Sequence, residues 1–235
     1  MKIEYFESLV STNDTARAAA REGAPALYTV AAKRQTGGRG RMGRRFLSPL
    51  GGTYFSTVLR PTFERARYGA ITPFAALAVH RAVKELLNVS LEIKWVNDLL
   101  LNGKKVCGIL AESGEDKEGK PFVILGIGIN TGTEPLPKEL AEIAACVPYQ
   151  DCTRLIERIL YYLSTFESEI ANGAWVEDYR LALCYLQKRV LVMRGEDKRS
   201  AQLLDVDAEG GLLVLYTDGT REILRGGEIS LRREP

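Results

Sequence analysis

The chain has few of the residues from which many catalytic and metal sites are built. Among its 235 residues there is one histidine, His80, so a histidine-rich metal site is excluded and a Ser-His-Asp triad would have to use that residue. The four cysteines, at positions 107, 146, 152 and 184, form no C-x-x-C pair, which argues against a zinc ribbon or a thioredoxin-type site. Since His80 lies among apolar neighbours without a partner, we expect it to be structural.

Long apolar segments are also missing. No apolar run approaches about 18 residues, and the N-terminal segment has no uninterrupted apolar stretch of the kind found in secretion signals. Cysteines without a pattern are typical of reduced thiols in the cytoplasm. The sequence therefore predicts a cytoplasmic protein that neither spans a membrane nor is exported.

The net charge of +2 is close to zero, but the charges are unevenly distributed. Residues 31–45 hold six cations and no acid: Lys33, Arg34, Arg39, Arg41, Arg44 and Arg45. Without these six cations the net charge becomes −4. An apolar share of 46% and a charged share of 26% are typical of globular proteins and exclude a disordered chain. We therefore expect a cationic, glycine-rich loop on a slightly acidic body.

Apolar patterns and turn residues predict a body in which strands and helices are mixed. Strands are expected over residues 3–9, 27–32, 53–59, 91–95 and 122–129. Helices are expected to begin at Ser11, Thr72, Asp151 and Trp175. Ser11 and Asp14 have the spacing of a capping box. Asn102-Gly103 between two apolar runs predicts a hairpin over residues 99–110 with a type I′ turn, which favours a mixed sheet over a purely parallel one.

The composition changes near Gln187. From there, short alternating strands, expected over residues 189–193, 201–206, 211–217 and 220–224, are separated by turn residues, and no helical pattern follows. Such a series predicts a small β-barrel. The sequence thus predicts two domains, an α+β body over residues 1–186 and an all-β module over residues 187–235.

The glycine-rich loop is the first candidate site. Gly38, Gly40 and Gly43 form the pattern G-x-G-x-x-G, but a dinucleotide site needs a helix directly after it, and Pro49 and two glycines follow instead. A nucleic-acid-binding arm is an alternative that the net acidic remainder disfavours. We favour an anion clamp, in which glycines let backbone N–H groups approach a phosphate and arginines add bidentate donors.

The segment Lys94-Trp95-Val96-Asn97-Asp98, followed by Lys105, is the second candidate. Asn and Asp at a strand end can bind hydrated Mg²⁺ or orient a nucleophile, and a lysine nearby suits a phosphate or carboxylate. The alternative is a solvated hairpin edge with ordinary turn residues.

Two shorter motifs are ambiguous by themselves. Glycines inside the apolar strand Gly126-Ile127-Gly128-Ile129-Asn130 indicate close approach of a ligand or of another backbone, and Asn130 can reach a ligand or start a turn. Ser11-Thr12-Asn13 can bind a ligand or merely cap a helix.

Taken together, these motifs resemble the biotin protein ligase family. The matching segments are STN at 11–13, QTGGRGRMGR at 35–44, KWVND at 94–98, GKKVCGIL at 103–110 and GIGIN at 126–130. The resemblance implies an α+β fold, with a mixed sheet and packed helices in a catalytic domain like that of class II aminoacyl-tRNA synthetases, and a small C-terminal SH3-like β-barrel. It also implies a short form without an N-terminal DNA-binding domain, no DNA binding and a possible homodimer.

The resemblance further implies a two-step reaction. Biotin and ATP, with Mg²⁺, form biotinyl-5′-AMP, and a lysine of a biotin carboxyl carrier protein domain then takes the biotinyl group. Such chemistry depends on placing anions together and needs no histidine base. The carrier protein itself is not indicated.

The resemblance assigns site residues as follows. The catalytic residues are Lys105, Arg41 and Asp98. The biotin-binding residues are Ser11, Thr12, Asn13, Gln35, Gly38, Arg39, Arg41, Lys105 and Gly108. The ATP-binding residues are Arg41, Arg44, Phe46, Asn97, Lys105 and Asn130, with Asn97 or Asn130 also helping to place Mg²⁺ and no residue assigned as a definite metal ligand.

Two positions depart from the family pattern. Val96 stands where the family usually has proline, and Phe46 stands where it often has tryptophan. Phe46 keeps an aromatic face for adenine but lacks the indole N–H. The alternatives are a lipoate–protein ligase, which shares the fold and the adenylate chemistry, and a non-enzymatic nucleic-acid-binding protein that uses the arginine loop.

Overall fold

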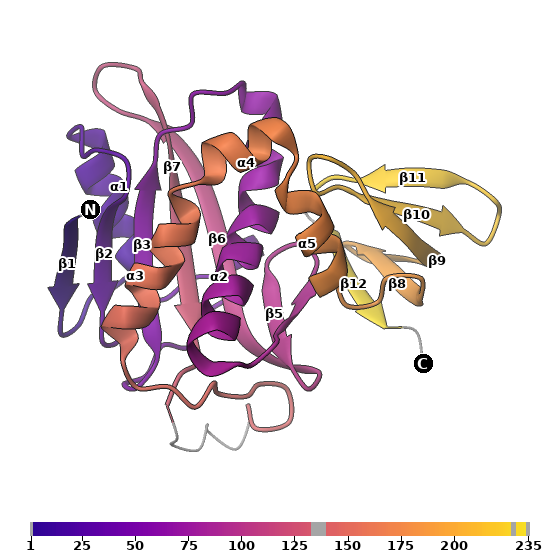
Figure 1. Cartoon of the computed structure of the whole chain (residues 1–235), viewed down its shortest axis with the longest axis horizontal. Helices are drawn as coiled ribbons and strands as arrows, with labels where there is room; N and C mark the ends of the chain where they lie inside the picture. The colour runs from indigo at the N-terminus through magenta and orange to yellow at the C-terminus, as the bar shows by residue number, and fades with distance from the viewer. Residues whose placement is uncertain (1, 133–139, 227–228, 234–235) are drawn as a thin grey trace.

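The chain folds into two β-sheets with helices packed on the larger one (Figure 1). The structure is a computed structural model that describes residues 2–132, 140–226 and 229–233. The strands are β1 (Lys2–Phe6), β2 (Tyr28–Ala32), β3 (Thr53–Leu59), β4 (Glu92–Lys94), β5 (Asp98–Leu101), β6 (Lys104–Glu115), β7 (Pro121–Ile129), β8 (Arg189–Arg194), β9 (Asp197–Val206), β10 (Leu212–Tyr216), β11 (Arg221–Leu224) and β12 (Ile229–Arg233). The α-helices are α1 (Thr12–Arg21), α2 (Ile71–Leu87), α3 (Cys152–Leu163), α4 (Phe166–Asn172) and α5 (Trp175–Ala182).

The larger sheet has seven strands in the order β1-β2-β3-β7-β6-β5-β4. Strands β1 and β2 are parallel because α1 crosses between them, and the remaining neighbours are antiparallel. The sheet is therefore mixed, as predicted. Asn102 and Gly103 both have positive φ, 51° and 77°, which confirms the expected type I′ turn between β5 and β6.

Helices cover both faces of this sheet. Helix α1 packs on one face over a small core that includes Ala16 and Val58, whereas α2 to α5 pack over the main core on the other (Figure 1). The alternation along β3 explains the division, since Phe55 faces the main core and Val58 the small one. Asp151 caps α3 as predicted, its carboxylate accepting a hydrogen bond from the Arg154 N–H at 3.0 Å.

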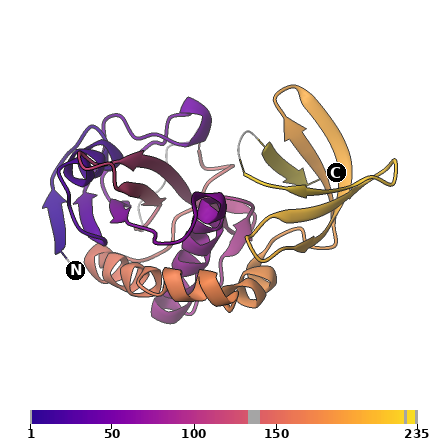
Figure 2. The same ribbon diagram turned by 90° about the horizontal axis from the view of Figure 1, so that it is seen from above.

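The smaller sheet is antiparallel, in the order β11-β10-β9-β8-β12. Sequence patterns had identified its first four strands but not β12. Seen from above, it lies at the opposite end of the molecule from β1, and α3 to α5 run along one side (Figure 2). The Trp95 indole N–H donates to the Gly210 carbonyl at 2.9 Å, and Arg180 pairs with Asp205 at 2.7 Å. These contacts join the smaller sheet to the body; the division into domains at residue 186 stays a proposal.

His80 has the structural role expected for it. Its Nδ1 lies 2.7 Å from the Leu91 carbonyl oxygen, and burial lowers the pKa of the imidazole. None of the described helices is long and apolar enough to cross a membrane.

Candidate functional site

A cavity of about 300 Å³ lies where the glycine-rich loop crosses the larger sheet. Segments far apart in the chain form its wall, from the start of α1, the loop, the β4–β5 turn, β6, β7 and the smaller sheet. The predicted site residues that line it are Ser11, Thr12, Gln35, Arg39, Arg41, Arg44, Phe46, Asn97, Asp98, Lys105 and Gly108. The loop folds over the cavity as a short 3₁₀ turn, Arg41–Gly43, and no helix follows it, which agrees with rejecting a dinucleotide fold.

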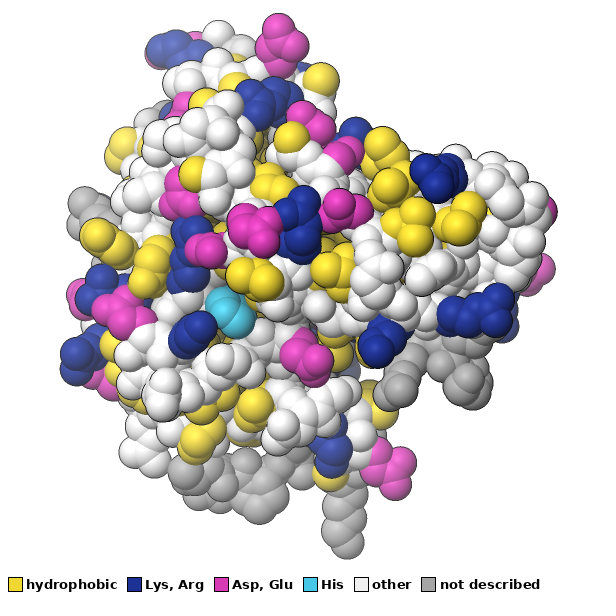
Figure 3. Space-filling model, turned by 45° about the vertical axis from the view of Figure 1, so that its right-hand side comes forward, with side chains coloured by type: hydrophobic (Ala, Val, Ile, Leu, Met, Phe, Trp, Pro, Cys, Tyr) yellow, Lys and Arg dark blue, Asp and Glu magenta, His cyan; other side chains and the backbone are white. Residues whose placement is uncertain are grey.

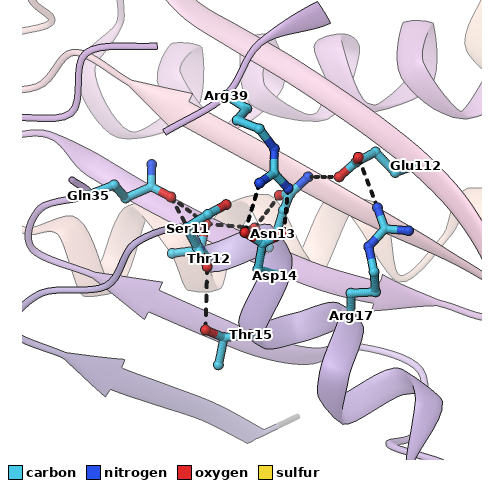
Figure 4. A network of polar contacts seen from close by, with 10 residues as sticks. Ser11, Thr12, Asn13, Asp14, Thr15, Arg17, Gln35, Arg39 and Glu112 are labelled. Atoms are coloured by element: carbon cyan, nitrogen blue, oxygen red, sulfur yellow. Dashed lines mark hydrogen bonds and ion pairs between the residues drawn. The ribbon is translucent and has the colours of Figure 1, made fainter. Parts of the chain in front are cut away.

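One end of the cavity, called the uncharged end below, is lined by Ser11, Thr12 and Gln35, and the last two are hydrogen-bonded to each other (Figure 4). Gln35 Oε1 accepts from the Thr12 backbone N–H at 2.8 Å and from the Thr12 hydroxyl at 3.1 Å. Gln35 Nε2 donates to the Ser48 hydroxyl at 2.9 Å. These bonds fix the orientation of the Gln35 amide, with Oε1 toward Thr12 and Nε2 toward Ser48. The protein itself therefore holds the donors and acceptors at this end in one orientation.

Ser11 differs from its predicted local role. It occupies the N-cap position of α1, and its carbonyl accepts from the Thr15 N–H at 3.3 Å, but its side chain makes no capping hydrogen bond. The predicted capping box is therefore wrong. Asp14, its expected partner, is paired instead with Arg39 of the loop (Figure 4). Ser11 is buried and lines the cavity, which leaves its hydroxyl available to a ligand there.

Asn13 and Gly38 support this end from behind and do not line the cavity. The Asn13 amide is bonded within the protein, to Ser56 and Glu112. A Cβ at Gly38 would lie 2.5 Å from the Phe46 carbonyl oxygen and 3.2 Å from Gln35 Nε2. Glycine is required at position 38 because the loop backbone passes so closely.

The other end of the cavity is cationic, with Lys105 at its centre. Lys105 Nζ lies 2.6 Å from Asp98 Oδ1 and 5.8 Å from the centre of the Phe46 ring. The backbone of Lys105 is fixed by its neighbours: its N–H donates to the Ile143 carbonyl, and its carbonyl accepts from Ala145. Asn130 Nδ2 lies 3.4 Å from that same carbonyl oxygen. Asn130 thus contacts the segment that holds Lys105 and does not line the cavity.

Arg41 reaches the same end from the loop. Its Nη1 donates to Asn97 Oδ1 at 3.0 Å, and Asn97 Nδ2 donates to the Ile109 carbonyl at 3.1 Å. Asn97 therefore connects the loop to β6. Burial lowers the pKa of the Arg41 guanidinium, an effect that Asp98 partly offsets. Because burial disfavours a cation, an anion that enters the cavity is stabilised beside Arg41.

Arg39 lines the cavity and extends to Asp14 at the start of α1 (Figure 4). Its Nη1 donates to Asp14 Oδ2 at 2.8 Å, and this hydrogen bond holds the pKa of the Asp14 carboxyl below its usual range. The pair joins the loop to the start of α1.

The Phe46 ring explains why two neighbouring positions in the sheet are glycine. Gly108 on β6 and Gly128 on β7 are cross-strand neighbours, and an added Cβ would lie 3.0 Å from the ring at Gly108 and 2.5 Å from it at Gly128. The third, Gly126, is covered by Asn13, whose Oδ1 would lie 2.0 Å from an added Cβ. The Phe46 ring and the Asn13 amide thus come close to these glycines, as the pattern indicated, and Gly126 and Gly128 also line the cavity.

Several residues that line the cavity were not assigned to the site from the sequence, among them Lys94, Trp95, Met193 and Leu231. Lys94 and Trp95 belong to a motif that the sequence had singled out, so their position there was the available signal. Met193 and Leu231 come from the smaller sheet, and no local pattern indicates which of its faces meets the cavity.

The described residues contain no cluster of three or more His, Cys, Asp or Glu side chains that could hold a metal ion. Asp98 is the acid that lines the cavity, and it is paired with Lys105. These residues therefore do not form a resident Mg²⁺ site, and Mg²⁺ that arrives with a nucleotide would depend on phosphate oxygens for ligands.

Comparisons with known proteins give one consistent result. A sequence model of the biotin/lipoate A/B protein ligase family matches residues 5–130. The chain is 34% identical to the bifunctional ligase/repressor BirA of Bacillus subtilis (strain 168), over 93% of this chain and 71% of that protein. It is 30% identical to the biotin–[acetyl-CoA-carboxylase] ligase of Mycobacterium tuberculosis, over 86% and 78% of the two chains. Its fold matches that of the biotin protein ligase from Aquifex aeolicus in complex with biotin and ATP, with a TM-score of 0.83, 28% identity and 99% coverage of both chains.

Proposed function

The chain belongs to the biotin/lipoate A/B protein ligase family, and we propose that it activates biotin with ATP and transfers the biotinyl group to a lysine of a biotin carboxyl carrier domain. It is an enzyme of the ligase class. The choice of biotin and ATP is supported by the fold match to a ligase in complex with both. The choice of acceptor is supported by the acetyl-CoA carboxylase in the name of the mycobacterial relative.

The single observation on which the mechanism rests is the division of the cavity. An uncharged, hydrogen-bonded end formed by Ser11, Thr12 and Gln35 suits a neutral polar ring system such as the ureido group of biotin. The end formed by Arg41, Arg44 and Lys105 suits anions. Biotin has both chemistries, a ureido ring at one end and a carboxylate at the other, and ATP brings the second anion.

In the first step, a carboxylate oxygen of biotin attacks the α-phosphorus of ATP. A bond forms between them, the bond from the α-phosphorus to the bridging oxygen breaks, and pyrophosphate leaves. Lys105 would lie between the carboxylate and the α-phosphate, where its charge offsets their repulsion. Arg41 and Arg44 would hold phosphate oxygens through bidentate hydrogen bonds. Phe46 would offer its ring face to adenine.

In the second step, the amine of the acceptor lysine attacks the carbonyl carbon of biotinyl-5′-AMP. An amide bond forms, the bond between the acyl carbon and the phosphate oxygen breaks, and AMP leaves with the electron pair. The amine loses a proton in the process. Asp98 would orient the amine by accepting a hydrogen bond from it. The glycine-rich loop, including Gly38 and Arg39, would close over the adenylate and keep water from hydrolysing it.

Three further points extend the proposal. The smaller sheet would be the SH3-like barrel of a C-terminal domain over residues 187–235, the enzyme would be a homodimer, and it would bind no DNA. The absence of DNA binding is supported by the net charge of −4 outside the six cations of residues 31–45, and on the face drawn in Figure 3 Lys and Arg side chains are interspersed with Asp and Glu.

Mass spectrometry of a biotin carboxyl carrier domain tests the whole reaction. We expect the carrier to gain one biotinyl group when it is incubated with this protein, biotin and Mg-ATP. A carrier whose acceptor lysine is replaced by arginine should gain none. An unmodified wild-type carrier would contradict the proposal.

ATP–pyrophosphate exchange separates biotin from lipoate. We expect exchange that depends on biotin, and much less with lipoate at the same concentration. Exchange with lipoate alone would instead support a lipoate–protein ligase.

A further inference from the structure

Three neighbouring strands of the larger sheet form a socket for the Asn13 carboxamide. Ser56 on β3 donates to Asn13 Oδ1 at 2.5 Å, and Glu112 on β6 accepts from Asn13 Nδ2 at 2.7 Å. Between them, Gly126 on β7 provides the space, because any side chain there would collide with the amide. Asn13 is 5% exposed and Ser56 is fully buried, so their bond forms away from solvent, whereas the Glu112 side chain is 27% exposed and its bond to Asn13 is partly buried.

Glu112 fixes the orientation of that amide. One of its carboxylate oxygens accepts from Asn13, and the other accepts from Arg17 Nη2 at 2.9 Å (Figure 4). Asn13 and Arg17 are four residues apart on α1, so the carboxylate contacts two successive turns of one face of the helix. Because a carboxylate only accepts hydrogen bonds, the amide nitrogen must face β6 and the amide oxygen must face Ser56.

The same contacts continue to the cavity. The Ser56 oxygen lies 2.7 Å from the Thr12 hydroxyl oxygen, and Thr12 bonds Gln35 through both its N–H and its hydroxyl. Thr12 therefore has hydrogen-bond neighbours in the sheet and in the loop. A shift of the first turn of α1 would move Ser11 and Thr12 together.

We infer that Glu112 is a positioning residue for substrate binding, which sets the first turn of α1 through Asn13 and Arg17 and so places Ser11 and Thr12 at the uncharged end of the cavity. Glu112 does not line the cavity and acts through other residues. The inference rests on the proposed function, since it assigns that end to the ureido ring of biotin. It has a specific consequence: for biotin binding, the presence of a donor at one residue and an acceptor at the other should matter more than the charge on either residue.

Variants that exchange the donor and the acceptor between positions 13 and 112 test this consequence. In Asn13→Asp, two acceptor-only carboxylates face each other. In Glu112→Gln, the amide oxygen can serve Asn13 or Arg17, but not both. We expect each single variant to raise the KM for biotin about tenfold, the size of one lost, partly buried hydrogen bond, with the KM for ATP within about twofold.

The double variant Asn13→Asp/Glu112→Gln restores complementarity. The new amide at position 112 would donate to the new carboxylate at position 13 and accept from Arg17, while Ser56 would still donate to that carboxylate. We expect the KM of the double variant for biotin to return to within about threefold of wild type, a rescue expected only where the two substitutions compensate each other. Glu115→Gln is the matched control, since Glu115 lies on the same strand and pairs with Arg65, at the surface. It should change neither KM.

Dissociation constants for biotin, measured by calorimetry on folded samples with known melting temperatures, separate positioning from stability. Unchanged biotin binding in Glu112→Gln would overturn the inference, as would equal loss of kcat and both KM values. A double variant no better than the worse single variant would also overturn it. If Asn13→Asp does not fold, Glu112→Gln and Glu115→Gln still decide the question. Wild-type protein without biotin-dependent pyrophosphate exchange would instead contradict the proposed function.

Discussion

The two ends of the cavity are built in different ways. At the uncharged end, Thr12 and Gln35 are hydrogen-bonded to each other, and Thr12 is 3% exposed. At the cationic end, the Lys105 side chain is 37% exposed, and Arg41 and Arg44 come from the loop and its short 3₁₀ turn rather than from an α-helix or a sheet strand. The first end is held by hydrogen bonds within the protein, while the second combines two arginines of the loop with a partly exposed lysine of β6.

This difference follows from the ligands that each end is proposed to bind. A neutral polar ring gains little from long-range attraction, so it is recognised by donors and acceptors that are already oriented. Phosphates are attracted by charge from a distance, and residues that close over them can exclude water afterwards. The comparison predicts separable effects on biotin binding, on ATP binding and on chemistry.

The largest expected effect is that of Lys105→Ala. Removing the ammonium should slow adenylate formation by about 10²–10³-fold, because its charge offsets the repulsion between the two reacting anions. Lys104→Ala is the matched control: Lys104 precedes Lys105 on β6, and its Nζ donates to the Ala141 carbonyl instead. Pyrophosphate exchange measures both variants. Near-normal exchange in Lys105→Ala would show that the cationic end does not act as proposed.

Gly126→Ala should disturb the uncharged end. The added Cβ would lie 2.0 Å from Asn13 Oδ1, so α1 must shift. We expect the KM for biotin to rise about tenfold and the free energy of unfolding to fall by about 1–3 kcal/mol. Gly69→Ala, where an added Cβ meets nothing within 4 Å, is the control. If Gly126→Ala raised the KM for ATP more than the KM for biotin, the proposed separation of the two ends would be wrong.

Salt should act on one end more than the other. Raising NaCl from about 0.05 to 0.5 M shortens the screening length several-fold, so ATP should bind several-fold more weakly. The uncharged alcohol analogue of biotin should bind with less than about twofold change. Titration calorimetry with each ligand alone makes the measurement. Equal salt dependence for both would contradict the division into two ends.

The smallest effect is expected from Asp14→Asn, which removes the ion pair between α1 and the loop. The pair is about half exposed, so its worth is about 0.5 kcal/mol, and cleavage of residues 37–46 by protease should become about twofold faster. Because the pKa of Asp14 is lowered in the folded protein, the pair contributes fully above its ordinary pKa of about 3.9 and is lost as pH falls through the lower folded value. The assay therefore belongs at neutral pH.

Ligands should have the opposite effect on the same segment. We expect biotin and ATP together to protect residues 37–46 of the wild-type protein from cleavage. Identical cleavage patterns with and without both ligands would argue against closure of the loop.

Much of the fold was predictable because it depends on local rules. The β3 bounds, the Asn102-Gly103 turn and the Asp151 cap follow from patterns that span a few residues. The Ser11–Asp14 capping box failed in part because the Asp14 carboxylate is paired with Arg39, which is 25 residues away in sequence. Strand β12 has no such local signal, since β8 pairs with it from some 40 residues earlier in the chain.

The candidate site divides in the same way. The motifs identified which segments matter, because glycine, arginine and lysine in those patterns suit anions. They did not distinguish residues that line the cavity from those that support it. Asn13 and Asn130 have the side-chain chemistry of ligand contacts, yet their amides are bonded to neighbouring strands and loops.

By itself, the sequence determined the kind of chemistry: a cationic, glycine-rich loop and a lysine after a hairpin turn, with a single histidine that packs rather than reacts. The tertiary structure alone decided the direction of the hydrogen bonds at the uncharged end and the contribution of Met193 and Leu231 to the cavity wall. The physical reason is that charge and backbone freedom belong to single residues and short segments. The direction of a hydrogen bond, and the face of a sheet that meets a cavity, depend on partners that only folding brings together.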